Sequence, residues 1–203
     1  MKITPVTLRG LAVACAVASA LVAAPAAQAA PASAAQAVSA TGIDLNITMQ
    51  EQQKSNWCWD ASGNTIAAWF GNTLTQTKFC QIAHNETGTT CANNQGYLSD
   101  QQRVFRWLGF DDDGIYNSNG QTLSFSAIKT EIDNKRPIGT RIQWSNGGGH
   151  MHVLYGYDNA TSGQRVSYGD PLQGVQRYHH VSYSAYKSNS EFSWTHTLYG
   201  IKG

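Results

Sequence analysis

A change in residue pattern at Pro137 constrains the fold of this chain more than any other feature of its sequence. Upstream of Pro137, apolar residues recur with helical spacing; downstream, short apolar runs alternate with glycine-containing turns. Helices are predicted at Cys58 to Phe70, Phe79 to His84, Leu98 to Leu108 and Phe125 to Lys135. Strands are predicted at Ile43 to Met49, Ile138 to Trp144, His150 to Tyr157, Val166 to Tyr168 and Ser193 to Gly203. This order predicts an α+β domain, with an N-terminal helical part packed against a C-terminal antiparallel sheet.

The first residues have the pattern of an export signal. Lys2 and Arg9 give a positively charged start, Leu11 to Ala24 is apolar, and Ala27-Gln28-Ala29 matches a cleavage site. We therefore expect a signal peptide over residues 1–29, an Ala/Ser-rich leader over 30–42 and the folded domain over 43–203, secreted to the extracellular space. A retained anchor is the alternative, but the apolar run is short for a membrane span.

Charge argues against a nucleic-acid partner. The chain has 14 Lys and Arg against 13 Asp and Glu; without Lys2 and Arg9 the balance is 12 against 13, or −1. A nucleic-acid-binding domain would show a basic excess.

Three cysteines remain after the predicted signal peptide: Cys58, Cys80 and Cys91. An odd number in an exported protein leaves one thiol unpaired. Cys80 and Cys91 flank a polar loop and could close it as a disulfide, which would leave Cys58 free. The other two pairings, and three reduced thiols, remain open alternatives at this point.

Cys58 lies where a turn passes into a predicted helix. A thiol in the first turn of a helix lies at the positive end of the peptide dipoles, which favours the nucleophilic thiolate. Gln52 lies six residues upstream, before the turn, and its side-chain amide could donate a hydrogen bond to an oxyanion beside the sulfur. We therefore expect the Cys58 sulfur to attack the carbonyl carbon of a substrate.

A cysteine nucleophile needs an imidazole base, and His150 is the best placed of six histidines. It follows three glycines and opens an apolar strand, so its ring is expected at a cleft edge on a rigid element. His152 lies on the same face of that strand and is the main competitor. Asp170, before Pro171 at a strand end, is expected to orient the imidazole. The competing interpretations are that His150 is a surface residue or a hydrogen-bonded core residue without a catalytic role, and that Asp170 is an ordinary aspartate in a turn before proline.

Together these residues resemble a papain-like cysteine peptidase of the bacterial secreted and effector-type branch. The resemblance rests on the spacing of Gln52 and Cys58, on Trp57-Cys58-Trp59, on Gly149-His150 followed by Val153 to Tyr157, on Asp170-Pro171 and on Phe79 to Ala83. It implies a papain-like fold with a cleft between helices and sheet. It also implies a secreted endopeptidase that hydrolyses peptide bonds with Cys58, His150, Asp170 and Gln52, acts as a monomer on protein or peptide substrates, and uses no cofactor or metal.

Asp60 departs from the family pattern, which usually has alanine at this position, and we expect its carboxylate to point to solvent or to cap the helix. It favours an alternative, a non-catalytic exported module that binds peptide or glycan in a groove. The groove would be lined by Trp57, Trp59, Trp69 and Tyr155. Other acyl-transfer chemistry (transglutaminase- or amidase-like) would use the same residues. A zinc site made of Cys58, His150 and His152 is a weaker alternative, because it leaves the spacing of Gln52 unexplained.

Overall fold

The structure is a computed structural model that describes residues 42–118, 120–160 and 163–203, all of which belong to one compact unit over residues 38–203. The predicted signal peptide (1–29) and all but the last residue of the predicted leader (30–42) lie outside the described residues. In the part of the chain that is described, every helix is too short or too polar to cross a membrane.

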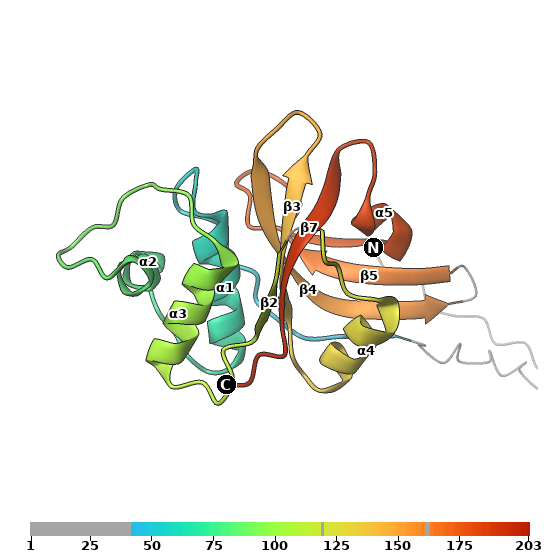
Figure 1. Ribbon diagram of the computed structural model, residues 1–203, viewed down its shortest axis with the longest axis horizontal. Helices are drawn as coiled ribbons and strands as arrows, with labels where there is room; N and C mark the ends of the chain where they lie inside the picture. The colour runs from blue at the N-terminus through green and yellow to red at the C-terminus, as the bar shows by residue number, and fades with distance from the viewer. Residues whose placement is uncertain (1–41, 119, 161–162) are drawn as a thin grey trace, which may run out of the picture. The chain divides into compact units, whose positions relative to one another are not determined.

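Three helices form one side of the structure (Figure 1): α1 (Cys58–Trp69), α2 (Gln76–His84) and α3 (Leu98–Leu108). Local sequence explains their ends. The Thr75 hydroxyl accepts a hydrogen bond from the first turn of α2, and Asn85 and Gly109 adopt left-handed conformations after α2 and α3. Buried aromatic rings hold the three helices together, with Phe79 packed edge-on against Phe105 at 6.4 Å.

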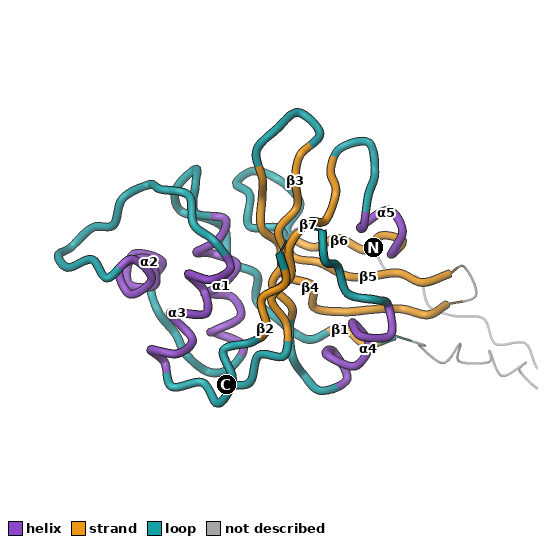
Figure 2. Tube along the Cα trace, in the orientation of Figure 1, coloured by secondary structure: helices purple, strands orange, loops and turns teal. Residues whose placement is uncertain are grey.

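A seven-stranded antiparallel sheet forms the other side, in the order β2-β7-β3-β4-β5-β6 with β1 also paired to β4. Its strands are β1 (Ile43–Asp44), β2 (Ile115–Asn117), β3 (Ile138–Trp144), β4 (Gly149–Ala160), β5 (Gly163–Gly169), β6 (Tyr178–Ser182) and β7 (Phe192–Tyr199). Two further helices, α4 (Phe125–Asp133) and α5 (Tyr183–Lys187), pack against the sheet (Figure 2).

The predicted α+β class, helices first and antiparallel sheet later, is confirmed. Several elements differ in detail. Strand β1 has two residues where Ile43 to Met49 was expected, and α2 starts at Gln76, before the predicted start at Phe79. Strands β2 and β6 and helix α5 were not predicted, because they are short and polar or partly exposed, and they gain their structure from neighbouring strands.

The α1 helix packs directly on β4, and this contact joins the two halves of the molecule. The Ser62 hydroxyl donates to the backbone carbonyl of Met151 at 3.1 Å, and both residues are buried. Because β4 begins at Gly149 and α1 begins at Cys58, the contact brings the start of the helix near the start of the strand.

The Cys80–Cys91 disulfide forms as one of the predicted pairings, with a Cα–Cα distance of 6.1 Å. Closing so short a loop contributes about 3 kcal/mol to stability in the chain-entropy view. The segment that follows Cys91 is held by two buried indoles: Trp57 donates to the Ala92 carbonyl and Trp59 to the Asn94 carbonyl. A Cβ at Gly96 would lie 2.4 Å from the Trp59 ring, so only glycine allows the backbone of this segment to pack against that ring.

Candidate active site

Cys58 is the first residue of α1, and among the described residues it is the one free cysteine. Its side chain is half-buried. The N-cap residue, Trp57, has a side chain without an acceptor, so it caps none of the first-turn N–H groups of α1. The backbone N–H of Cys58 therefore points out of the helix start beside the sulfur, where it can bind an anion.

Gln52 lies buried beneath the turn that leads to Cys58. Its Nε2 donates to the carbonyls of Lys54 at 3.0 Å and Ser55 at 2.8 Å, while its Oε1 has no partner in the described part of the chain. Its backbone N–H donates to the Pro171 carbonyl at 2.8 Å, which ties the turn to the segment that carries Asp170. The amide is thus positioned near the helix start, but its two N–H groups serve backbone carbonyls in this structure.

His150, on β4, and Asp170, directly after β5, form a buried hydrogen-bonded pair. The distance from His150 Nε2 to Asp170 Oδ1 is 2.7 Å. Asp170 is itself held by the Leu172 N–H, which donates to Oδ1 at 2.8 Å. Since Nε2 faces the carboxylate, Nδ1 is the ring nitrogen left to face the Cys58 sulfur.

Electrostatics favour a charged His150. Burial lowers the pKa of His150, but hydrogen bonds with Asp170 and with Cys58 and the negative charge on each raise it to about 9. Burial also disfavours the Asp170 carboxylate, yet its hydrogen bonds with His150 and His152 hold its pKa well below the usual range. The arrangement therefore holds an imidazolium between a carboxylate and a sulfur at neutral pH.

His152 lies deeper in the same pair of strands and has a different environment. Burial is the main reason that the pKa of His152 falls to about 4, with Asp170 opposing it and His150 and His179 adding to it. Its Nε2 is 3.6 Å from Asp170 Oδ2, and its Nδ1 is 3.3 Å from the Tyr186 hydroxyl. His152 is thus a neutral, fully enclosed ring that contacts the back of Asp170.

Asp60 is buried, so the expectation that it points to solvent or caps α1 is wrong. Its side chain is 0 % exposed, and neither carboxyl oxygen has a hydrogen-bond partner of good geometry among the described residues. Burial raises the pKa of Asp60 to about 9, although the Cys80 N–H and the Lys54 ammonium favour the charged form. The carboxyl is therefore neutral at pH 7.

The groove expected for a binding module does not exist in the form proposed. Trp57 and Trp59 are fully buried, and Tyr155 is 9 % exposed. The two indoles pack in the core and anchor the segment after Cys91, so they cannot line a ligand groove.

Two adjoining hollows lie beside His150, with volumes of about 230 Å³ and 260 Å³. They share the lining residues Tyr97, Arg141 and Met151, and His150 lines the first of them; the two together are called the cleft beside His150. The remaining lining residues are Asn56, Gln95, Gly96, Leu98, Tyr116, Gln143, Gly149, His150 and His196.

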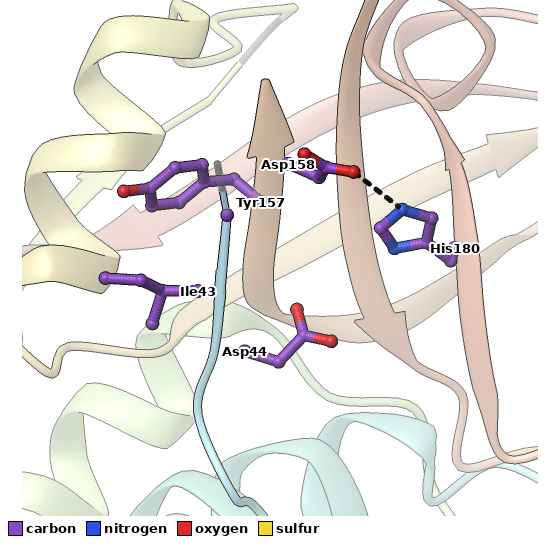
Figure 3. Close-up of a pocket in the computed structure, with 6 residues that line it drawn as sticks. Ile43, Asp44, Tyr157, Asp158 and His180 are labelled. Atoms are coloured by element: carbon purple, nitrogen blue, oxygen red, sulfur yellow. Dashed lines mark ion pairs between the residues drawn. The ribbon is translucent and has the colours of Figure 1, made fainter. Parts of the chain in front are cut away.

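A separate hollow of about 230 Å³ lies where β1 meets the far part of β4 (Figure 3). Ile43, Asp44, Tyr157, Asp158 and His180 line it together with Gly42, and Asp158 and His180 form an ion pair at 4.0 Å. Tyr157 is seven residues beyond His150 on β4, about 23 Å along an extended strand. This hollow is therefore not part of the cleft beside His150.

Sequence reasoning missed two residues of β3 that adjoin His150. Trp144 stacks on the His150 ring with centroids 5.8 Å apart, and Arg141 lines the cleft. Strands β3 and β4 form a hairpin in which Ile142 pairs with His150. The short glycine-rich turn between the two predicted strands was a signal that residues 141–144 would lie beside this histidine.

Two groups of side chains have metal-ligand chemistry within the described ranges. Cys80, His84 and Cys91 form one, but its two sulfurs are bonded to each other. His150, His152 and Asp170 form the other. The 2.7 Å distance between His150 Nε2 and Asp170 Oδ1 is shorter than the ~3.3 Å that separates two ligands of a tetrahedral zinc ion. Neither group presents a preformed site, and Cys58 belongs to neither.

A thiol at the start of a helix that contacts a histidine of an antiparallel sheet is the arrangement that defines papain-like thiol proteases. Residues 39–191 match the sequence profile of the family described as papain-like cysteine protease AvrRpt2, and the chain belongs to this family. The match covers more than half of the chain and includes Gln52, Cys58, His150 and Asp170. The protein is therefore a hydrolase that acts on protein substrates. No curated protein gave a significant match.

Proposed function

We propose that this protein is a secreted cysteine endopeptidase, acting as a monomer, in which Cys58 is the nucleophile, His150 the acid and base, and Asp170 the orienting carboxylate. The observation that carries the proposal is the buried chain of contacts from Asp170 through His150 to Cys58. The export-signal pattern of residues 1–29 supports secretion.

The reaction follows from the charges of these groups. The Cys58 thiolate attacks the peptide carbonyl carbon, and the carbonyl oxygen becomes an oxyanion. The proton on His150 Nδ1 passes to the leaving amine as the C–N bond breaks, which leaves a thioester on Cys58. His150 Nδ1 then takes a proton from water, the hydroxide attacks the thioester, and the C–S bond breaks. The thiolate and the imidazolium are restored.

The oxyanion would be held by the Cys58 backbone N–H, with Gln52 Nε2 as second donor. The first needs no rearrangement, because it lies at the uncapped start of α1. The second requires Gln52 to share or exchange one of its two bonds to the Lys54 and Ser55 carbonyls. Such an exchange is a rotation of one side-chain amide within hydrogen-bonding distance of the same turn.

The test is cleavage of an unfolded protein such as casein by the full-length protein and by Cys58→Ala. We expect internal cleavage by the wild type and a loss of at least about 10³-fold in the variant, because the nucleophile is gone. Undiminished cleavage by Cys58→Ala would contradict the proposal. Release of single terminal residues only would contradict the endopeptidase part.

Asp170→Asn is expected to lower kcat/KM by about 10- to 100-fold and to shift its alkaline limb to lower pH. Asn can still accept a hydrogen bond from His150 Nε2, so the ring stays oriented. The hydrogen bond with the Asp170 carboxylate is the largest of the contacts that raise the pKa of His150 to about 9, and in the variant this bond is made to a neutral amide and is weaker. Since the leaving amine needs a protonated His150, activity should fall near pH 9 in the wild type and about one unit lower in the variant.

The measurement is a pH profile of kcat/KM for both proteins. Glu191→Gln is the control: it removes an exposed carboxylate that lines a further hollow together with Trp144, and it should leave the alkaline limb in place. An alkaline limb that does not move in Asp170→Asn would mean that Asp170 does not set the charge of His150.

A further inference from the structure

The cleft beside His150 contains one permanently charged side chain, Arg141. It lines both hollows, and Asp and Glu are absent from the lining residues of either hollow within the described part of the chain. His150 and His196 are the other ionisable nitrogen groups there. Burial and the Arg141 charge both lower the pKa of His196, so it adds no charge at neutral pH. Arg141 is therefore the one permanent cation among the described residues that line the cleft, next to the His150 imidazolium that Asp170 and Cys58 already pair.

Arg141 lacks a carboxylate partner in the protein itself. Over residues 42–118, 120–160 and 163–203, no ion pair joins it to an acidic side chain. Its Nη1 donates to the Thr195 hydroxyl at 3.0 Å, and its Nη2 to the Gln143 side-chain oxygen at 3.2 Å. A guanidinium has five N–H donors, so these two neutral contacts fix the group in place and leave donors for a ligand.

The position of the guanidinium places its ligand near the reacting bond. A Cβ on Gly149 would lie 2.4 Å from Arg141 Nη2, so the guanidinium lies against the backbone of the residue that directly precedes His150. Arg141, Gly149 and His150 line the same hollow of about 230 Å³, so a group bound by the guanidinium shares this hollow with the residue proposed as acid and base. Two tyrosines, Tyr97 (65 % exposed) and Tyr116 (36 % exposed), also line the cleft.

We propose that Arg141 forms a carboxylate-binding subsite, so that this peptidase prefers a substrate with a carboxylate within a few residues of the cut. The inference rests on the peptidase function proposed above. The carboxylate comes either from an Asp or Glu side chain or from the C-terminus of the substrate. Amidation of the substrate C-terminus removes the second source and leaves the first. Gly149 is part of the subsite, because any larger residue would displace the guanidinium.

The first experiment uses the full-length protein and a synthetic decapeptide library in two forms, with amidated and with free C-termini, and maps cuts by mass spectrometry. Enrichment of Asp and Glu at one fixed position near the cut in the amidated library supports the proposal, with a side chain as the source. Cuts confined to the free-carboxylate library at a fixed distance from the C-terminus also support it, with the chain end as the source. Cleavage without either preference overturns the proposal and leaves the peptidase function standing. Absence of any cleavage overturns both.

The second experiment compares kcat/KM for a preferred substrate and for its neutral twin, Glu against Gln or free acid against amide. We expect a ratio of about tenfold or more in the wild type, the size expected for a hydrogen bond to a charged group. The ratio should approach one in Arg141→Gln, take an intermediate value in Arg141→Lys and stay at the wild-type value in Arg165→Gln. Arg165 is a half-buried arginine on β5 that donates to the His180 carbonyl, so it matches the charge change outside the cleft.

Folding of each variant is checked by the rate of Cys58 alkylation. A ratio that survives in Arg141→Gln, with normal alkylation, overturns the proposal. If Arg141→Gln fails to fold, the substrate ratio of Arg141→Lys tests the proposal instead. Lysine keeps the positive charge but lacks the planar pair of N–H donors with which a guanidinium binds a carboxylate. A full wild-type ratio in Arg141→Lys would then count against guanidinium recognition.

Discussion

His150→Ala is expected to lower kcat/KM for peptide cleavage by at least about 10³-fold and to slow alkylation of Cys58 at neutral pH. His150 holds the proton that the leaving amine needs, and its loss removes the general acid, the general base and the charge partner of the sulfur together. The measurement combines a cleavage assay with the rate at which iodoacetamide labels Cys58. Both rates should fall, because both depend on the same thiolate.

His152→Phe is the matched control for this experiment. His152 is fully enclosed by aromatic rings, including Tyr168 with centroids 4.6 Å apart, so phenylalanine fills a similar volume. With a pKa near 4 it is uncharged at neutral pH and cannot act as an imidazolium acid, so we expect a loss of less than about tenfold. Equal losses in the two variants would mean that the acid and base role does not belong to His150.

Asp60→Asn is expected to raise the free energy of unfolding by about 4 kcal/mol at pH 7. The pKa of Asp60 rises from 3.8 to about 9 on folding, so the folded protein must bind a proton that the unfolded chain releases. Each unit of difference is worth about 1.36 kcal/mol, and 3.2 units separate pH 7 from 3.8. Asparagine has nearly the same size and no charge to lose, so it removes this cost.

The sign of the pH dependence follows from the raised pKa. The contribution of Asp60 is fully present below pH 3.8 and is lost as pH rises toward 9. The stability difference between Asp60→Asn and wild type should therefore be small at pH 4, grow through neutral pH and level off above pH 9. Denaturant unfolding at several pH values measures it, and Asp111→Asn, at an exposed aspartate, is the control. A difference that does not change with pH would show that the carboxyl is charged inside the fold.

The three glycines before His150 have roles in the structure that differ from the one predicted from the sequence. They were expected to let the backbone approach a cleft. In the structure, Gly147 and Gly148 have φ angles of 97° and 80° and nothing within 4 Å of a Cβ, so they form the turn of the β3–β4 hairpin. Gly149 alone has a packing requirement, and that requirement comes from Arg141.

Most of the candidate site could be predicted because its residues carry local signals. Cys58 comes at a helix start, His150 at the start of an apolar strand and Asp170 at a strand end, and the unpaired cysteine followed from an odd count. Local signals also gave the α+β class, because helical and strand periodicities depend only on near neighbours along the chain.

Only the tertiary structure decided properties that depend on burial and on long-range pairing. Two histidines on one strand face look alike in sequence, yet one is held charged beside Asp170 and Cys58 while the other is enclosed and neutral. Asp60 looks like a favourable helix-start carboxylate, but tertiary packing buries it completely, near Cys80 of α2 and Lys54. Arg141 joins the cleft only because β3 pairs with β4. The sequence determined which chemical groups are present and on which elements they lie; the fold determined their solvent exposure and their partners, and these two quantities set their charge.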